Sequence, residues 1–446
     1  MTDAGGPSEK APAFAQRLTL LDATFVVVGA TVGVGIFFTP ASAARELPDG
    51  LLLLLAWAAA GGLSLLGALT YAELGALRSE AGGPFLYLRA AFGRGVALVY
   101  GVGALGVIVS GAIALMATLF AQNLARFVPM PEGMVPVVAA AAIAAVVAVN
   151  VLGVKPGARF NNVLTGVKIA TLVLLGGAGL VAGRAPAEPP RPVGAAEGGG
   201  FLAALVPILF SYGGWQAVTS IAPEVRNAKR TLPRALALGT ALVVALYLLA
   251  NAGFLATLGA GEMARLGPTF AAEAASLAFG RFASDAVAAA ILVSALGVAN
   301  AYVLVMPRIA FAMAEEGLLP RAVASIHPRF GTPHVALVSF GAWSIAVLLT
   351  SADFDALLNR VVAADWLFFG ACGVALFRLR AVSGAPEPGT FRMPLYPLVP
   401  ALFVAGAAAV AAVAAVRHPL DSLVGAGLLL GAAAAIGLLA RRRTPR

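Results

Sequence analysis

The feature that most constrains this chain is a succession of long apolar runs separated by short polar loops. A helix that crosses a bilayer needs about 20 consecutive, mostly apolar residues. Only 11% of the 446 residues are charged, where a soluble domain has roughly 25%. The sequence therefore predicts an all-α membrane protein and argues against a soluble enzyme or a nucleic-acid binder. We expect twelve transmembrane helices, at 21–45, 50–74, 95–127, 134–153, 160–183, 200–222, 232–257, 283–311, 333–350, 356–377, 394–416 and 420–440.

The net charge of +9 reflects where the basic residues lie along the chain. Cytosolic loops of membrane proteins are enriched in Lys and Arg. With the N-terminus placed inside, most basic residues fall on the cytosolic side, from Lys10 and Arg17 to the arginines at 441–443. We therefore expect both termini to be cytosolic, and we attribute the basic charge to membrane topology.

Two of the apolar runs carry a glycine cluster near their middle. The first run contains the sequence GATVGVGIF at 29–37, and the sixth contains FSYGGW at 210–215. Unwound backbone is tolerated at bilayer depth only where it lines a cavity or is buried in protein. The clusters begin runs 1–5 and 6–10, which is the arrangement typical of an inverted-repeat transporter. Close packing of intact helices through glycine is the alternative, and two clusters in matching positions favour two broken helices.

A broken helix offers groups that suit a zwitterionic ligand. The N-terminal end of a half-helix carries partial positive charge and free N–H groups, which favour a carboxylate. The free carbonyls at the other half-helix end favour an ammonium group. Two breaks that lie close together would supply both kinds of group to one ligand.

Further short motifs follow one another in a fixed order from about residue 18 to residue 400. They are GVGIF at 33–37 with Pro40, YAELG at 71–75, AGGPFLYL at 81–88, NVLGVK at 150–155, Glu224 with Arg226-Asn227, Arg308 with EGLLP at 316–320, and PLYP at 394–397. This ordered set resembles the amino acid–polyamine–organocation (APC) superfamily of transporters. The YGGW break and the sequence DWL at 365–367 look closest to its L-type amino acid transporter branch and bacterial relatives.

The resemblance implies a 5+5 inverted repeat with discontinuous helices 1 and 6, followed by helices 11 and 12. It also implies alternating access and a place in the cytoplasmic (inner) membrane of a bacterium. The chain would then divide into a cytosolic tail at 1–19, a first repeat at 20–183, an outer loop at 184–199, a second repeat at 200–378, a cytosolic loop at 379–393, helices 11 and 12 at 394–440, and a cytosolic tail at 441–446.

By motif position, the resemblance implies an amino acid site built from both breaks. The residues are Thr31, Val32, Gly33, Val34, Gly35, Phe210, Ser211, Gly213, Trp215 and Asp365. Backbone N–H groups at 33–35 would hold the substrate carboxylate, and carbonyls at 31, 210 and 213 would hold its amine. Phe210 would also form an aromatic gate. Val34 stands where many relatives have Ser, which removes a hydroxyl but keeps the backbone donor.

Lys168 lies within the fifth run, where a charged side chain is costly and points to function. In sodium-independent relatives, a lysine at the matching position places its amine where sodium-coupled relatives bind sodium. The resemblance thus implies an ion-site surrogate, which could also carry protons, and adds Ser294 to the same site. The alternative is a lysine that extends to the cytosolic interface.

Asp365 leaves the substrate open. The matching position in the L-type branch is usually Asn, so an Asp there could favour a cationic substrate, or it could pair with Arg360. We expect a sodium-independent secondary transporter of neutral L-amino acids, working as an exchanger or a proton symporter. The alternative is a cationic amino acid or polyamine transporter that uses Asp365.

Several roles have no supporting residues in this sequence. Cys372 is the one cysteine and lies in an apolar run, and the three histidines do not cluster as metal ligands. We therefore expect no enzymatic activity, no cofactor and no metal. Some relatives are linked to a single-span glycoprotein through a cysteine in an outer loop. This chain has none there, so we expect no disulfide-linked partner subunit.

Overall fold

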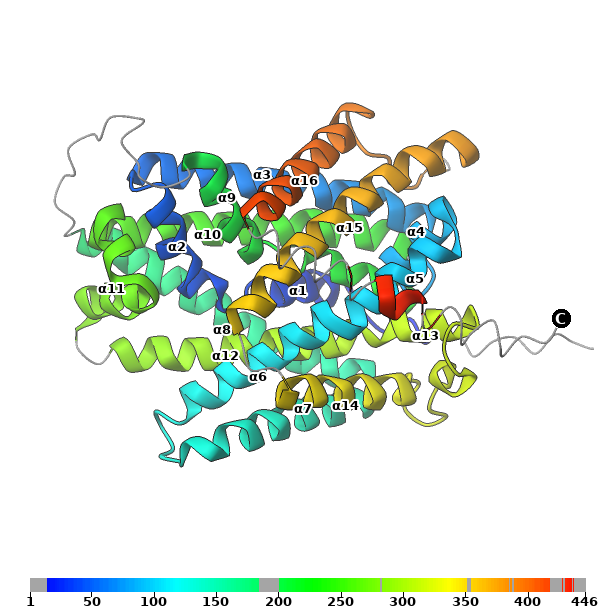
Figure 1. Ribbon diagram of the computed structural model, residues 1–446, viewed down its shortest axis with the longest axis horizontal. Helices are drawn as coiled ribbons and strands as arrows, with labels where there is room; N and C mark the ends of the chain where they lie inside the picture. The colour runs from blue at the N-terminus through cyan, green and yellow to red at the C-terminus, as the bar shows by residue number, and fades with distance from the viewer. Residues whose placement is uncertain are drawn as a thin grey trace, which may run out of the picture.

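The computed structural model describes residues 14–183, 200–280, 283–350, 354–384, 386 and 389–417, with scattered positions between 427 and 436. The described residues form helices and one isolated β-bridge, between Leu18 and Val225. Figure 1 shows the long helices running side by side along the long axis of the molecule, with α1 near its centre. The fold class is therefore the all-helical one that the apolar runs predict.

The first half of the chain, up to residue 183, begins with a helix in pieces. Its elements are α1 (Leu20–Thr31), the 3-10 helix η1 (Val34–Phe37), α2 (Thr39–Glu46), α3 (Gly50–Leu77), α4 (Pro84–Phe92), α5 (Arg94–Gly103), the π-helical η2 (Ala104–Ile108), α6 (Val109–Leu124), η3 (Glu132–Met134), α7 (Val135–Val151) and α8 (Val154–Ala182).

The second half also begins with a helix in pieces. Its elements are α9 (Gly200–Ser211), the 3-10 helix η4 (Trp215–Glu224), α10 (Ala228–Leu266), η5 (Gly267–Thr269), α11 (Phe270–Phe279), α12 (Ala283–Val305), α13 (Pro307–Glu315), η6 (Arg321–Ala324), α14 (His334–Thr350), α15 (Phe354–Ser383) and α16 (Leu398–Arg417).

Eleven of the twelve predicted runs coincide with these helices. Six helical stretches among the described residues are long and apolar enough to cross a membrane: 50–77, 94–124, 154–182, 200–224, 228–266 and 283–315. The twelfth run, 420–440, lies mostly outside the described residues, which include only scattered positions between 427 and 436. The twelve-helix total, the 5+5 repeat and the division into tails and loops therefore stay predictions.

Some boundaries differ from the predicted ones because helices continue past the apolar residues. α8 begins at Val154 and α10 spans Ala228–Leu266, where the runs were 160–183 and 232–257. Two short helices, α4 and α11, occupy segments that the sequence predicted as loops. α4 begins at Pro84 directly after Gly83, and a proline in the first turn is compatible with a helix because its missing N–H has no partner there.

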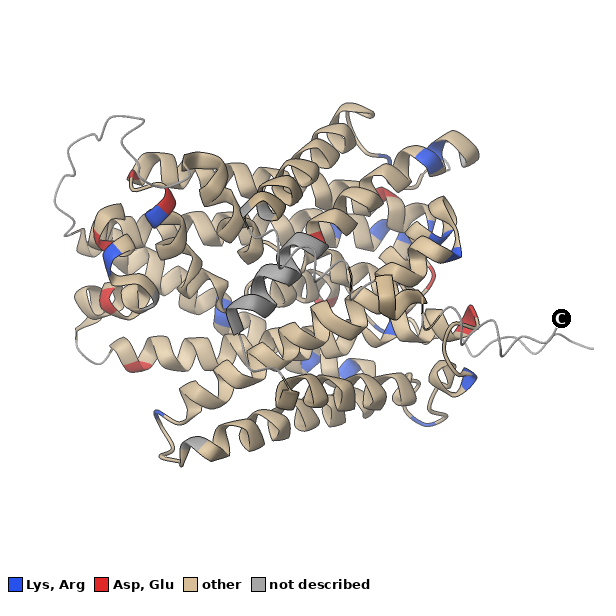
Figure 2. Cartoon of the chain, in the orientation of Figure 1, with Lys and Arg blue, Asp and Glu red and all other residues tan. Residues whose placement is uncertain are grey.

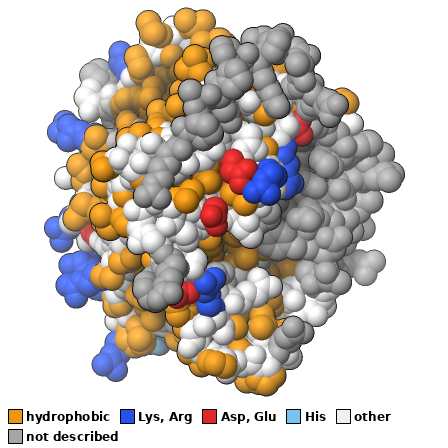
Figure 3. Space-filling model, turned by 90° about the vertical axis from the view of Figure 1, so that its left-hand side faces the viewer, with side chains coloured by type: hydrophobic (Ala, Val, Ile, Leu, Met, Phe, Trp, Pro, Cys, Tyr) orange, Lys and Arg blue, Asp and Glu red, His pale blue; other side chains and the backbone are white. Residues whose placement is uncertain are grey.

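Charged residues are concentrated at the two ends of the helices. Figure 2 shows Lys and Arg gathered mainly at the end where α4 and α13 lie. The opposite end, seen in Figure 3, has basic and acidic side chains next to one another. Ion pairs near that end join Arg126 to Asp285 at 2.7 Å and Arg265 to Glu262. The apolar middle between the two ends fits a multi-pass protein that spans a bilayer.

Candidate functional site

The first predicted break lies between α1 and η1. α1 ends at Thr31, whose hydroxyl donates to the carbonyl of Val27 at 2.8 Å. Gly33 is then extended, with φ −106° and ψ −162°, before η1 starts. The first N–H groups of a helix have no partner within it. The N–H groups at 33–35, which the resemblance assigned to a substrate carboxylate, therefore stand at the start of η1.

The second predicted break lies between α9 and η4, and it touches the first. Gly214 has φ +113°, a left-handed conformation that favours glycine. A Cβ atom on Gly214 would lie 2.4 Å from the carbonyl oxygen of Ala30 at the end of α1. Ser211 Oγ also lies 2.7 Å from Thr39 Oγ1 at the start of α2. The two breaks therefore form one packed unit, with backbone against backbone.

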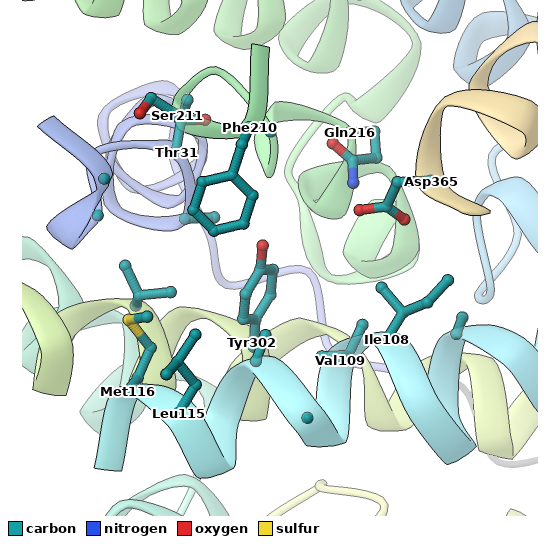
Figure 4. Close-up of a pocket in the computed structure, with 18 of the residues that line it drawn as sticks. Thr31, Ile108, Val109, Leu115, Met116, Phe210, Ser211, Gln216, Tyr302 and Asp365 are labelled. Atoms are coloured by element: carbon teal, nitrogen blue, oxygen red, sulfur yellow. The ribbon is translucent and has the colours of Figure 1, made fainter. Parts of the chain in front are cut away.

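Residues of both breaks line a single pocket. The predicted site residues that line it are Thr31, Gly33, Val34, Gly35, Phe210, Ser211, Gly213 and Asp365. Figure 4 shows the ring of Phe210 pointing into this pocket toward Tyr302 of α12. Ile108, Val109, Leu115 and Met116 form an apolar side wall. A mostly apolar pocket with a few polar groups is the usual form of a small-molecule site.

The π-helical segment η2 forms part of the same wall. Ala104 and Ile108, at its two ends, both line the pocket. Single π-helical turns within longer helices occur frequently at functional sites. The sequence analysis did not identify this segment, whose wide turn depends on packing that no local pattern reports.

Lys168 lies behind the first break, outside the pocket lining. Its side chain is buried, and Nζ donates to the carbonyls of Gly29 at 2.9 Å and Val32 at 2.8 Å. The last carbonyls of a helix have no intrahelical partner and lie at the negative end of its dipole. The ammonium group satisfies carbonyls of this kind at the end of α1. It points into the protein at the break, whereas the alternative interpretation required it to extend to the membrane surface.

Two residues of α12 complete the surroundings of the ammonium group. Ser294 Oγ donates to the carbonyl of Val32 at 3.4 Å, so the structure brings Ser294 and Lys168 to one acceptor. A Cβ atom on Gly297 would lie 2.5 Å from Lys168 Cε and 2.8 Å from Nζ. Gly297 therefore provides the space that the lysine fills. The sequence analysis missed it, because Gly297 is one glycine among 51 in the chain.

Tyr247 of α10 is a second residue that the sequence analysis missed. Its hydroxyl lies 3.0 Å from the carbonyl oxygen of Thr31 and 3.0 Å from that of Ser211. The ring is buried against Trp57 and Tyr212, with ring centroids 5.6 and 5.1 Å away. Tyr247 therefore ties the end of α1 to the end of α9. A buried tyrosine needs a hydrogen-bond partner for its hydroxyl. This requirement is the one property of the sequence that could have indicated the contact.

Two predicted substrate residues have side chains outside the pocket lining. Val32 is buried, and its carbonyl faces Lys168. Trp215 is fully buried and packs edge-to-face on Tyr71, with ring centroids 5.0 Å apart. Both residues therefore support the breaks from behind, and the structure brings neither side chain into the pocket with Phe210.

Asp365 and Gln216 lie on the same side of the pocket. Figure 4 shows the amide of Gln216 turned toward the carboxylate of Asp365. Gln216 Oε1 accepts a hydrogen bond from the N–H of Gly214 at 3.1 Å, so its NH₂ group is the end left for other partners. Asp365 forms no ion pair with the side chains that the structure describes, and the side chain of Arg360 lies outside them.

Buried ion pairs connect the helices at the end where basic residues gather. Arg308 of α13 donates to Glu224 at 2.7 and 3.1 Å, and both side chains are 1% exposed. Arg380 of α15 donates to Glu73 of α3, whose Oε2 also accepts from the N–H of Met393 at 2.7 Å. Glu73 is therefore held both by α15 and by the segment before α16. The Arg308–Glu224 pair joins the end of η4 to α13, and the Arg380–Glu73 pair joins α15 to α3.

The known proteins that this sequence resembles are amino acid transporters and exchangers by their names. The amino acid permease family model matches residues 18–432. The serine/threonine exchanger of Bacillus subtilis is 30% identical over 404 residues, which cover 88% of this chain and 89% of that protein. The human cystine/glutamate transporter is 29% identical over 410 residues, 89% of this chain and 80% of that one. The human b(0,+)-type amino acid transporter 1 is 29% identical over 384 residues, 83% of this chain and 77% of that one. With both helix breaks at one pocket and a match over nearly the whole chain, the protein belongs to the amino acid permease family of the APC superfamily.

Proposed function

We propose that this protein is a sodium-independent secondary transporter of neutral L-amino acids that works by alternating access. The observation that carries the proposal is the pocket between the two breaks. It brings the N–H groups at the start of η1 and the carbonyls at the ends of α1 and α9 to one place. That combination fits the carboxylate and ammonium groups that all α-amino acids share.

The sodium-independent part of the proposal depends on Lys168. A sodium ion near a helix break is held by carbonyl and hydroxyl oxygens. Here the ammonium group of Lys168 binds the carbonyls of Gly29 and Val32, and Ser294 lies beside it. A fixed positive charge supplied by the protein would make a bound sodium ion unnecessary and would repel one.

The apolar wall of the pocket supports a neutral substrate. Ile108, Val109, Leu115 and Met116 would contact the substrate side chain, and Phe210 would cover the site as a gate. Among the relatives, the serine/threonine exchanger carries two neutral amino acids by its name, which is consistent with a small neutral substrate. Exchange and proton symport both remain compatible with this geometry.

A direct test uses the purified protein in liposomes. All proteinogenic amino acids would compete against one labelled substrate, in sodium and in choline buffer. We expect competition by neutral amino acids and equal uptake in the two buffers. Uptake that needs amino acid inside the vesicle would identify exchange, and uptake that collapses with a protonophore would identify proton symport. Absence of uptake for every amino acid would refute the proposal.

Asp365 supports a second candidate function, the transport of cationic amino acids or polyamines. It lines the pocket and has no ion pair with a described side chain. A cationic side chain bound nearby would supply the missing partner. The variant Asp365→Asn separates the two functions. If the substrate is cationic, the variant loses its preference for arginine or lysine over alanine; if the substrate is neutral, the order of competition stays the same.

The proposal includes the orientation and the absence of a covalent partner. The gathering of basic residues near α4 and α13 favours that end as the cytosolic one, with both termini inside. The Bacillus subtilis exchanger among the relatives supports a place in a bacterial inner membrane. Cys372, the one cysteine, is fully buried in α15. A buried thiol there cannot form a disulfide with a second chain, so we propose that no disulfide-linked subunit is required.

A further inference from the structure

A basic groove lies at the start of α10, away from the substrate pocket. It is lined by Lys229, Arg230, Pro233, Arg234 and Ala237 of α10 and by residues 389–391 of the segment before α16. The three cationic side chains are exposed. Arg230 Nη2 lies 3.9 Å from the position that a Cβ of Gly389 would take, so its guanidinium reaches the opposite wall.

The arginines of this groove differ in their ion pairing from other arginines at the same end of the molecule. Arg89, Arg308 and Arg380 each form an ion pair with a glutamate. The side chains of Arg230 and Arg234 form neither an ion pair nor a hydrogen bond with any residue that the structure describes.

The position on the helix adds to the positive potential of the groove. Basic residues at 229 and 230 stand in the first turn of α10, which has no acidic residue. A helix N-terminus is already partially positive and stabilises anions. The helix dipole disfavours the charge of Arg230 there, and a bound anion would offset that effect.

The surface beside the groove indicates which anion. Residues 230, 234 and 238 are four apart, so they lie along one stripe of the helix. The third of them, Leu238, is 55% exposed and belongs to α10, a helix long and apolar enough to cross a membrane. A ligand that follows this stripe meets cations at one end and exposed apolar surface beyond them.

We propose that this groove binds the phosphate headgroup of an anionic phospholipid in the cytosolic leaflet. Arg230 and Arg234 would hold the phosphate oxygens, and the acyl chains would lie along α10 beyond Leu238. Basic pockets between membrane helices on the cytoplasmic side are suited to such headgroups. The orientation is the one given under the proposed function, whereas the binding itself does not depend on transport.

Occupancy of the groove would affect the second break. η4 ends at Glu224 and α10 begins at Ala228, so three residues separate them. Thr231 Oγ1 donates to the carbonyl of Arg226 at 2.7 Å, which fixes this connection to the first turn of α10. A headgroup that restrains α10 at this point would restrain η4 as well, and the transport rate would depend on anionic lipid.

Native mass spectrometry of the full-length protein with phosphatidylglycerol or phosphatidylcholine tests the site. We expect selective retention of phosphatidylglycerol. Each cation near an anionic headgroup contributes about fivefold to the affinity, so Arg230→Gln with Arg234→Gln should weaken binding about 25-fold. Arg321→Gln is the matched control, because Arg321 is an exposed cation of η6 outside the groove. It should bind like the wild type.

Free phosphate is distinguished by adding inorganic phosphate to protein in phosphatidylcholine. Binding of phosphate as tight as that of phosphatidylglycerol would overturn the assignment to lipid. Equal retention of phosphatidylglycerol and phosphatidylcholine, or undiminished binding by the double variant, would overturn the site. Absence of amino acid uptake with selective, arginine-dependent lipid binding would refute the proposed function and leave the lipid site standing.

Discussion

Replacement of Lys168 by alanine is the sharpest test of how the first break is held. The wild-type ammonium group donates to the carbonyls of Gly29 and Val32 at 2.9 and 2.8 Å. Hydrogen bonds from a charged group contribute about 1.5–3 kcal/mol each, so the two together contribute about 3–6 kcal/mol. The variant leaves both carbonyls without this donor in a buried place. We expect the geometry of the break, and with it substrate binding, to be lost.

The lower end of that range sets the expected effect on transport. Each 1.36 kcal/mol corresponds to a factor of ten in rate. A loss of about 3 kcal/mol therefore predicts a decrease in uptake of roughly a hundredfold or more. Lys168→Arg should also fail, since a planar guanidinium cannot replace a compact ammonium in a space defined by Gly297. The assay is the initial rate of labelled amino acid uptake into proteoliposomes, in sodium and in choline buffer.

Two further variants separate a functional effect from misfolding. Lys168→Met keeps most of the apolar volume and removes only the charge, so it should fold and still fail to transport. Lys155→Ala removes an exposed cation at the start of the same helix and should transport normally. Full activity of Lys168→Ala, or wild-type uptake that requires sodium, would remove Lys168 from the mechanism.

Three other substitutions test the contacts around the breaks. Gly214→Ala places a Cβ 2.4 Å from the backbone oxygen of Ala30 at a φ of +113°, so the melting temperature should fall sharply. Gly33→Ala is the control: the atom nearest to its new Cβ lies 3.4 Å away, so this variant should melt like the wild type. Tyr247→Phe keeps the ring and removes the hydroxyl, which should raise the apparent KM about tenfold at a cost of about 1–3 kcal/mol; an unchanged KM would contradict the bridging role. Phe210→Ala should reduce transport more than tenfold, roughly the cost of losing a large aromatic contact, and unchanged uptake and affinity would exclude Phe210 as the gate.

The sequence was sufficient to predict the places where the helices break. Glycine clusters at bilayer depth are costly in a continuous helix, and this cost is a local property of residues 29–35 and 213–214. The place of Lys168 at an ion site was implied by the family resemblance, because its position in an apolar run alone also allowed a lysine that extends to the cytosolic interface. The first prediction needed the matching positions of the two glycine clusters, and the second needed the family resemblance.

The contributions of Tyr247, Gly297 and Gln216 could not be predicted in the same way. Each depends on how a helix is rotated about its axis and how closely it approaches a neighbour. These quantities arise from the packing of many small side chains, and no single apolar run contains them. Trp215 illustrates the same limit, since its place in the motif was predictable while the direction of its indole, away from the pocket, was not.

Several of these contacts meet at the end of α1, where the number of hydrogen-bond donors and acceptors affects substrate binding. Tyr247 has one hydroxyl proton, and two carbonyl oxygens, those of Thr31 and Ser211, lie 3.0 Å from it. One proton cannot satisfy both acceptors fully, whereas each carbonyl oxygen has two lone pairs. A substrate ammonium group brings three donors. Binding at the predicted carbonyl of Thr31 would therefore let the hydroxyl of Tyr247 turn to Ser211, so that both broken helices gain a full hydrogen bond when the amino acid is held. An amine that also binds the predicted carbonyls at 210 and 213 would then replace Tyr247 as the link between α1 and the second break, which would couple occupancy of the site to a joint movement of the two breaks.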